Sequence, residues 1–138
     1  MSRKAKMGRG VAVVGAGMSK FGAFTDKTSR DLFVEAFQAM AKSVDKGIET
    51  KDIEALYGGN FSSDLFENQG HIGPIMADWV GLVPKPATRV EAACASGGLA
   101  LRTAFIAVAS GLFDIVVASG VEKMSNLPTE RVTDTLAA

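Results

Sequence analysis

Apolar and polar residues follow one another in blocks along the chain, and the spacing within each block predicts a strand or a helix. The β-branched run at 11–14 is closed by Gly15 and predicts a buried strand. Further strands are predicted at 53–58, 88–92 and 115–119. The last is a continuous apolar run, so we expect a parallel strand covered on both faces.

Helical periodicity appears between these strands. A first helix is predicted from the Thr-Ser pair at 28–29, which can cap it, to a stop at Gly47. A second is predicted at about 75–80, after Gly73 and Pro74 break the pattern. Strands that alternate with helices place the chain in the α/β class.

The helix predicted at 97–110 is apolar on nearly every side. Its sequence from 97 to 109, GGLALRTAFIAVA, contains only Arg102 and Thr103 as polar residues. A helix of this kind is buried all round, whereas a helix on the surface of a sheet shows a polar face. We therefore predict that it lies between two sheets, the second supplied by chain outside this sequence.

Composition limits the class of protein. With 138 residues, 47% of them apolar, the chain is the size of one modest domain, predicted at 11–138 after a flexible basic start at 1–10. The 15 basic and 15 acidic side chains balance, which gives no sign of a nucleic-acid partner. No apolar run reaches the roughly 18 residues that span a bilayer. The single cysteine forms no internal disulfide, as expected of a cytoplasmic protein.

Two candidate sites are disfavoured on their spacing. Gly15-Ala16-Gly17 follows a predicted strand, but Lys20 stands where a dinucleotide fingerprint needs a third small residue, so a tight turn explains these glycines better. His71 has no acidic partner at a telling spacing, which favours a loop or interface histidine over a catalytic base. One His and one Cys cannot complete a tetrahedral metal site, and we expect no metal and no cofactor.

Cys94 lies in VEAACASGG, residues 90–98, where a predicted strand gives way to a helix. Such strand ends carry the sites of α/β proteins, and the partial positive charge of a helix N-terminus favours a thiolate. The small residues around the sulfur would let a substrate approach. A lone cysteine is also common as a small buried side chain, so both interpretations remain open at this point.

Residues 90–125, VEAACASGGLALRTAFIAVASGLFDIVVASGVEKMS, resemble the nucleophile region of thiolases, which make or cleave 3-ketoacyl-CoA. The strand, the Cys-Ala-Ser-Gly turn, the apolar helix, Gly-x-x-Asp at 111–114, the next strand and GVEKMS follow in the family's order. The opening VAVVGAGMSKFG, residues 11–22, also resembles the family's first strand and loop. The combination is most similar to archaeal-type thiolases, related to the sterol-carrier type.

The resemblance implies a fold and a mechanism. The chain would be part of the N-terminal half of a five-layered α-β-α-β-α fold, with a mixed, mostly parallel sheet and a buried central helix. Cys94 would be the nucleophile of a ping-pong Claisen condensation, forming an acyl thioester, and its backbone N–H would contribute to an oxyanion hole. The family's catalytic His residues and second Cys lie in a second half, so we expect this chain alone to be inactive.

Partners and alternatives follow from the same resemblance. We expect acyl-CoA substrates, with acetoacetyl-CoA the favoured ketoacyl-CoA. We also expect a homodimer or homotetramer, with hydroxymethylglutaryl-CoA synthase as a candidate partner. Ketoacyl synthases share the fold and the cysteine, but the two glycines after Ser96 and the element at 122–125 favour a thiolase. Hydroxymethylglutaryl-CoA synthases also place a cysteine before glycines, and there the element VEKMS at 121–125 favours a thiolase. A non-catalytic half that acts as a binding or scaffold partner is the other alternative.

Overall fold

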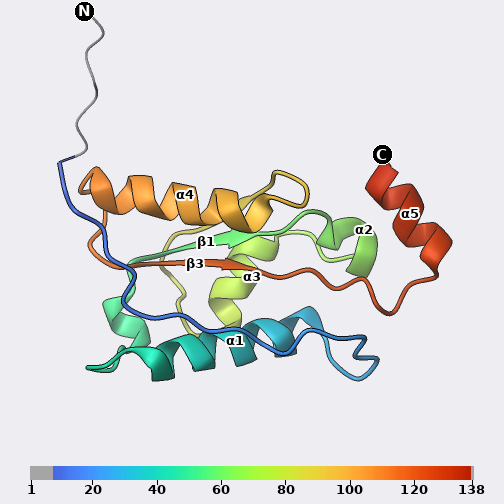
Figure 1. The fold of residues 1–138 in the computed structure, drawn as a ribbon, viewed down its shortest axis with the longest axis horizontal. Coiled ribbons are helices and arrows are strands. Elements are labelled where there is room, and N and C mark those ends of the chain that lie inside the picture. The colour runs from blue at the N-terminus through green and yellow to red at the C-terminus, as the bar shows by residue number, and fades with distance from the viewer. Residues whose placement is uncertain (1–7, 138) are drawn as a thin grey trace, which may run out of the picture.

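Residues 8–137 are described by the computed structural model, and they form a three-stranded sheet with helices on both faces (Figure 1). The strands are β1 (Ala55–Gly59), β2 (Ala87–Val90) and β3 (Val116–Gly120). Their order is β2-β1-β3, and both pairings are parallel. The α/β class is therefore confirmed.

The sheet matches three of the four predicted strands in place and direction. Tyr57 in the central strand pairs with Thr88 of β2 on one side and with Ala118 of β3 on the other. β3 is half-buried along most of its length, so the prediction that it would be covered on both faces is wrong. Its carboxyl end and those of β1 and β2 lie at one edge of the sheet.

The strand predicted at 11–14 is absent, and this prediction is wrong. The segment runs without a ladder partner, and Val13 and Val14 are 77% and 62% exposed. β1 already has a neighbour on each edge, so the segment does not enter beside it. The chain just after the segment contacts the helix at 29–43, since the Ala16 N–H donates to the Ser43 hydroxyl at 2.8 Å.

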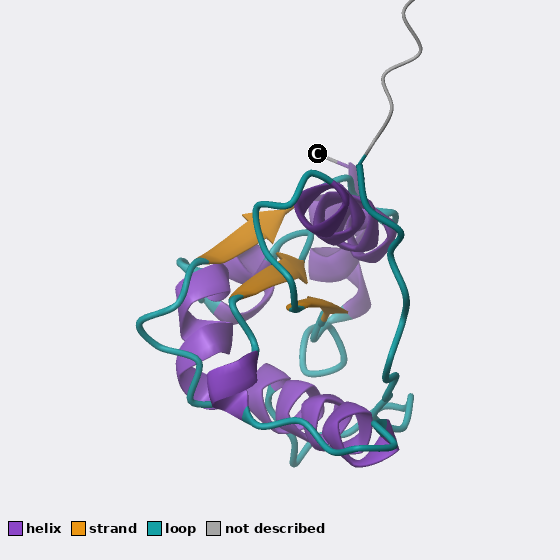
Figure 2. Ribbon diagram, turned by 90° about the vertical axis from the view of Figure 1, so that its left-hand side faces the viewer, coloured by secondary structure: helices purple, strands orange, loops and turns teal. Residues whose placement is uncertain are grey.

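The main helices lie on opposite faces of the sheet (Figures 1 and 2). α4 (Ser96–Ala109) covers one face and contacts all three strands, most of all β1 and β3. α3 (Ile72–Trp79) packs on β1 and β2 from the other side, and α1 (Ser29–Ser43) packs beneath it. The hydrophobic core between the sheet, α1 and α3 contains Phe33, Ile53, Leu56, Ile72, Met76, Ala77 and Leu82.

The predicted cap of α1 is confirmed. Thr28 and Asp31 form a capping box, in which the Asp31 N–H donates to Thr28 Oγ1 at 3.3 Å and the Thr28 N–H donates to Asp31 Oδ2 at 2.8 Å. The hydrogen bond from the Thr28 backbone, more than any other contact, lowers the pKa of Asp31. The helix ends at Ser43, and Gly47 turns the chain with φ +73°.

α3 begins at Ile72, three residues before the predicted start, so Gly73 and Pro74 lie inside its first turn. Proline is tolerated there because its missing N–H would have had no partner within the helix. Gly73 is needed for close packing, since a Cβ at this position would lie 2.8 Å from the Arg89 nitrogen.

The prediction that α4 is buried on all sides is only half right. Its small residues Ala100, Ala104 and Ala107 are buried against the sheet. Leu101 and Phe105 point away and are 56% and 46% exposed. Within the described part of the chain, α4 is therefore covered on one face only.

Three short elements were not predicted: η1 (Thr50–Asp52), α2 (Ser63–Glu67) and α5 (Thr129–Ala137). Most of the basic start predicted at 1–10 lies outside the described residues. Arg9 is described, and it forms an ion pair with Asp114. Among residues 8–137, no helix combines the length and apolar character needed to cross a membrane.

Candidate active site

Cys94 lies in the turn between β2 and α4, at the carboxyl edge of the sheet. Its thiol is free and exposed, and α4 begins two residues later, at Ser96. Within residues 8–137, Cys94 is thus not a small buried side chain. The structure also confirms the predicted position of the cysteine between a strand and a helix.

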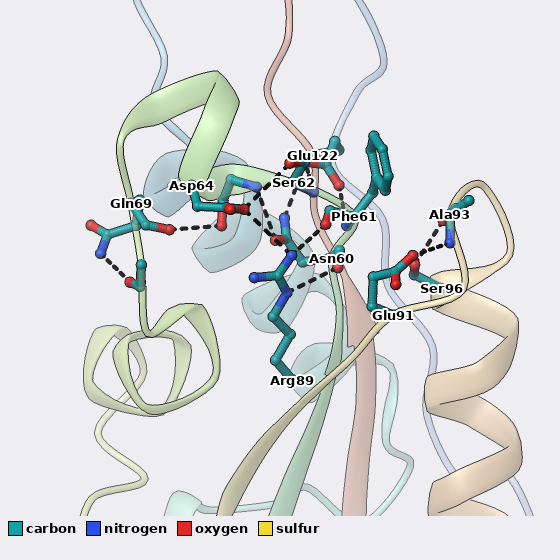
Figure 3. Close-up of polar contacts among 12 residues, drawn as sticks. Asn60, Phe61, Ser62, Asp64, Gln69, Arg89, Glu91, Ala93, Ser96 and Glu122 are labelled. Atoms are coloured by element: carbon teal, nitrogen blue, oxygen red, sulfur yellow. Dashed lines mark hydrogen bonds and ion pairs between the residues drawn. The ribbon is translucent and has the colours of Figure 1, made fainter. Parts of the chain in front are cut away.

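The turn that carries Cys94 is held by hydrogen bonds on both sides (Figure 3). Ala93 has φ +48°, in the left-handed region that few non-glycine residues adopt. The buried Ser96 hydroxyl accepts from the Ala92 N–H at 2.9 Å and donates to the Ala93 carbonyl at 2.7 Å. The Glu91 carboxylate accepts from the Ala93 N–H. These contacts fix the backbone on which the thiol is presented.

A cavity of about 920 Å³ opens beside the thiol. Cys94 and Gly97 line it on one side, and the turn at 59–61 lines it from the end of β1. Its other walls come from the loop after residue 17, from α1, from the segment that follows β3 and from α5. They are largely apolar and include Met18, Phe21, Leu32, Val132 and Leu136. Its volume lies within the range of small-molecule sites, and its walls suit an apolar group attached to the sulfur.

The turn after β1 forms a second fixed wall of the site (Figure 3). Glu122, just past β3, accepts hydrogen bonds from the Phe61 N–H at 2.6 Å and from the Ser62 N–H at 3.2 Å. Its carboxylate also accepts from Asn60 Nδ2 at 3.2 Å. The carboxylate thus joins the carboxyl ends of β1 and β3.

Arg89 holds the same turn from the side of β2. Its Nε donates to the Asn60 carbonyl at 3.2 Å, and its Nη2 donates to the Phe61 carbonyl. The guanidinium also forms an ion pair with Asp64 at 3.5 Å. Glu122 therefore accepts hydrogen bonds from the N–H groups of the turn, and Arg89 donates hydrogen bonds to its carbonyls. Residues at the ends of all three strands thus hold the turn in place.

The electrostatic setting of Glu122 combines opposing effects. Burial raises the pKa of Glu122 above 4.5, the usual value for this carboxyl group. The N–H donors of Phe61 and Ser62 and the charge of Arg89 favour the ionised form and offset part of this effect. Desolvation is the largest of the contributions, and it decides the direction.

The sequence model of the family described as "Thiolase, N-terminal domain" matches residues 11–137. The chain belongs to the thiolase family. The resemblance noted in the sequence is thus confirmed over nearly the whole length of the chain.

Two relatives are both named acetyl-CoA acetyltransferase and come from archaea. The protein of Methanothermobacter thermautotrophicus is 52% identical over 119 residues, which is 86% of this chain and 30% of the relative. The protein of Methanocaldococcus jannaschii is 49% identical over the same shares of the two chains. The chain therefore spans less than a third of the length of these thiolases.

Of the other sequence candidates, His71 lies outside the site, and Gly17 belongs to it only as part of the cavity wall. His71 is exposed and precedes α3 with φ +56°, its side chain forms no capping hydrogen bond, and it is not part of the cavity wall. Gly17 packs against α1, where a Cβ would lie 2.1 Å from the Met40 nitrogen. Gly15 and Gly17 allow the backbone of the N-terminal segment to pack closely against α1. The tight turn that we predicted for them is not what they form. In residues 8–137, no three His, Cys, Asp or Glu side chains gather as a metal site would require.

Sequence reasoning missed the polar residues that shape this site. Glu122 and Lys123 entered only as part of the family motif, and Asn60, Arg89 and Ser96 were given no role. A usable signal was present for two of them, because Asn60 directly follows β1 and Glu122 comes two residues after β3, both at the carboxyl edge of a parallel sheet. Ser96 and Arg89 carried no such signal, since their roles depend on the turns they contact.

Proposed function

We propose that this chain supplies the nucleophile of a thiolase-type acyl-CoA acyltransferase, with acetoacetyl-CoA as the favoured ketoacyl-CoA. The observation that carries this proposal is the exposed Cys94 thiol, held on a fixed turn at the edge of a largely apolar cavity. Membership of the thiolase family and the names of the two archaeal relatives support the same reaction.

The chemistry assigned to Cys94 proceeds in two stages. Its sulfur, as a thiolate, bonds to the carbonyl carbon of an acyl-CoA, and the bond from that carbon to the CoA sulfur breaks, so CoA leaves. The Cys94 backbone N–H would donate to the carbonyl oxygen while that oxygen carries negative charge. A second acyl-CoA, deprotonated at carbon 2, then bonds to the acyl carbon and releases the Cys94 thiolate. Thiolysis runs the same steps in reverse.

The remaining catalytic groups are assigned to chain beyond these residues. The resemblance places the activating His, the acid/base Cys and a further His in a second half. We therefore propose that activity requires that half, and that the reaction uses no cofactor apart from its CoA thioester substrates.

Assembly and location are proposed on the family resemblance alone. We propose a cytoplasmic enzyme of lipid metabolism that forms a homodimer or homotetramer. A complex with hydroxymethylglutaryl-CoA synthase is proposed on the same ground. Gel filtration of the purified complete protein, with and without that synthase, would test both assemblies.

The proposed reaction is tested by activity of the complete protein that contains this chain. We expect the native protein to cleave acetoacetyl-CoA with CoA, and Cys94→Ser to lose this activity while its circular dichroism spectrum is unchanged. Equal activity in Cys94→Ser would refute the role of Cys94. Absence of activity in the native protein would favour the scaffold interpretation, and preference for carrier-protein thioesters would favour a ketoacyl synthase relative.

A further inference from the structure

Lys123 is a buried lysine just past β3, with 5% of its surface exposed. Its ammonium donates to the Phe24 carbonyl at 2.7 Å and to Asn126 Oδ1 at 3.0 Å. A third hydrogen bond goes to the Ser125 hydroxyl. An ammonium has three N–H donors, so protein oxygens use all of them and none is left for a ligand.

The partners of Lys123 are neutral. None of the ion pairs formed within residues 8–137 includes this ammonium. Burying a charge without an opposite charge is costly, and buried ionic groups often stabilise a fold no better than apolar side chains of similar size. Stability alone therefore does not account for a lysine at position 123. Its role is better judged from the two segments that its hydrogen bonds join.

Lys123 joins two walls of the cavity that Cys94 faces. One is residues 18–24, here called the Phe21 loop, which contains no helix or strand. Its Met18 and Phe21 side chains are 72% and 83% exposed and line the cavity. The other wall is the segment 123–127. The Phe24 carbonyl is the point of attachment, and it also accepts from Ser125 Oγ at 3.4 Å.

We propose that Lys123 is a positioning residue, which fastens the Phe21 loop to the segment after β3 so that Met18 and Phe21 form an apolar wall opposite Cys94. If the proposed function holds, this wall contacts the acyl-thioester part of the substrate. Lys123 itself does not touch the substrate. It acts through the loop, and its removal should weaken substrate binding without removing the nucleophile.

The rate of trypsin cleavage after Lys20, inside the Phe21 loop, measures how firmly the loop is attached to the segment after β3. This test uses the 138-residue chain. A hydrogen bond from a charged donor is worth about a tenfold change in an equilibrium, so Lys123→Met should speed this cut about tenfold relative to the cut after Lys46. Lys85→Met is the matched control, because Lys85 Nζ also donates to two carbonyls, those of Thr50 and Lys51, but away from the cavity. An unchanged ratio in Lys123→Met would overturn the proposal.

A second variant covers the case in which Lys123→Met does not fold, judged by circular dichroism. Asn126→Ala changes an exposed residue and removes one of the three acceptors. It should also speed the cut after Lys20, by less than Lys123→Met. If the folded Asn126→Ala protein is cut at the native rate while Lys123→Met is unfolded, the attachment is refuted.

The substrate part is tested by kinetics of the complete protein. Lys123→Met should raise KM for the acyl-CoA about tenfold and leave kcat within about twofold, as expected when binding is lost and the chemistry is retained. Lys85→Met should change neither. A faster cut with an unchanged KM would overturn the role in substrate binding. If the native protein shows no thiolase activity, the proposed function fails, and the proteolysis ratio still decides whether Lys123 holds the loop.

Discussion

At the residue scale, Glu122 is the side chain whose chemistry the structure specifies most fully. One of its oxygens accepts from Asn60 Nδ2 and the Ser62 N–H, and the other accepts from the Phe61 N–H. An amide in its place would turn an N–H group toward one of these donors. The carboxylate is thus required by the hydrogen bonds of the turn, although burial opposes its ionisation.

Replacing Glu122 by Gln should lower the free energy of unfolding by about 1–3 kcal/mol at neutral pH, because one donor of the turn loses its acceptor. Urea unfolding followed by circular dichroism measures this change. Glu35→Gln is the control, since Glu35 pairs with Lys27 at the surface and should contribute little. A Glu122→Gln protein as stable as the native chain would contradict the hydrogen-bond assignment.

The same variant tests the direction of the pKa shift. Folding raises the pKa of Glu122 above 4.5, so the folded state binds a proton more readily than the unfolded state. The stability of the native chain relative to Glu122→Gln should then grow as the pH falls through the folded-state pKa, and level off below about 4.5. A difference that narrows on acidification would mean that the N–H donors outweigh burial.

Individual residues also show where sequence reasoning succeeds. Cys94 could be placed at the edge of the sheet, and the Thr28 cap could be placed at the start of α1, because both depend on neighbours close in sequence. The hydrogen bond between Phe61 and Glu122 joins residues that lie 61 positions apart in the sequence. The one between Lys123 and Phe24 joins residues that lie 99 positions apart. Local spacing does not encode such pairs, and they had to be seen in the fold.

At the scale of elements, the site depends on how closely α4 approaches the end of β1. A Cβ added to Gly59 would lie 2.6 Å from the Ser96 carbonyl carbon and 2.7 Å from the Gly97 nitrogen. Both atoms belong to the backbone of α4 and cannot move without shifting the helix. This glycine lets the first turn of α4, just after Cys94, rest on the sheet.

Gly59→Ala should therefore destabilise the fold by about 1–3 kcal/mol, as overpacking does in other cores. Gly98→Ala is the matched control, because a Cβ there meets nothing within 4 Å and alanine is the better helix former. Thermal unfolding of the two variants separates them. Equal melting temperatures would show that α4 does not rest on β1 in this way.

The elements also mark the limit of pattern reading. The runs at 53–58 and 115–119 were identified correctly because their apolar residues enter the sheet. The run at 11–14 has the same β-branched character, but Gly15 and Gly17 pack against α1 and no strand edge pairs with it. The β propensity of a segment indicates that it could form a strand. Whether a neighbouring strand is free to pair with it depends on the rest of the fold.

At the scale of the whole molecule, one face of α4 exposes large apolar side chains. Leu101 and Phe105 on this face and Leu112 just beyond it are all exposed, while the opposite face of the helix is buried. The chain also covers only 30% of its archaeal relatives. Both facts agree with the prediction that further chain covers α4, which the apolar sequence of the helix had already indicated.

Without a cover on this face, the 138-residue chain should self-associate and bind a hydrophobic dye, because exposed apolar patches promote both. The double variant Leu101→Ser, Phe105→Ser should reduce dye fluorescence and shift the mass measured by sedimentation toward the monomer. Leu65→Ser, on α2, is the control and should change neither, although Leu65 is 44% exposed. A native chain that is monomeric and binds no dye would contradict this prediction.

The location of the acyl group decides whether Cys94 forms the acyl-enzyme. Trypsin should release Cys94 in the peptide 90–102, between the cuts after Arg89 and Arg102. After the complete protein is incubated with acetyl-CoA and quenched in acid, mass spectrometry should find one acetyl group on this peptide, and none on it in Cys94→Ser. An unmodified peptide 90–102 in a protein that cleaves acetoacetyl-CoA would contradict the account.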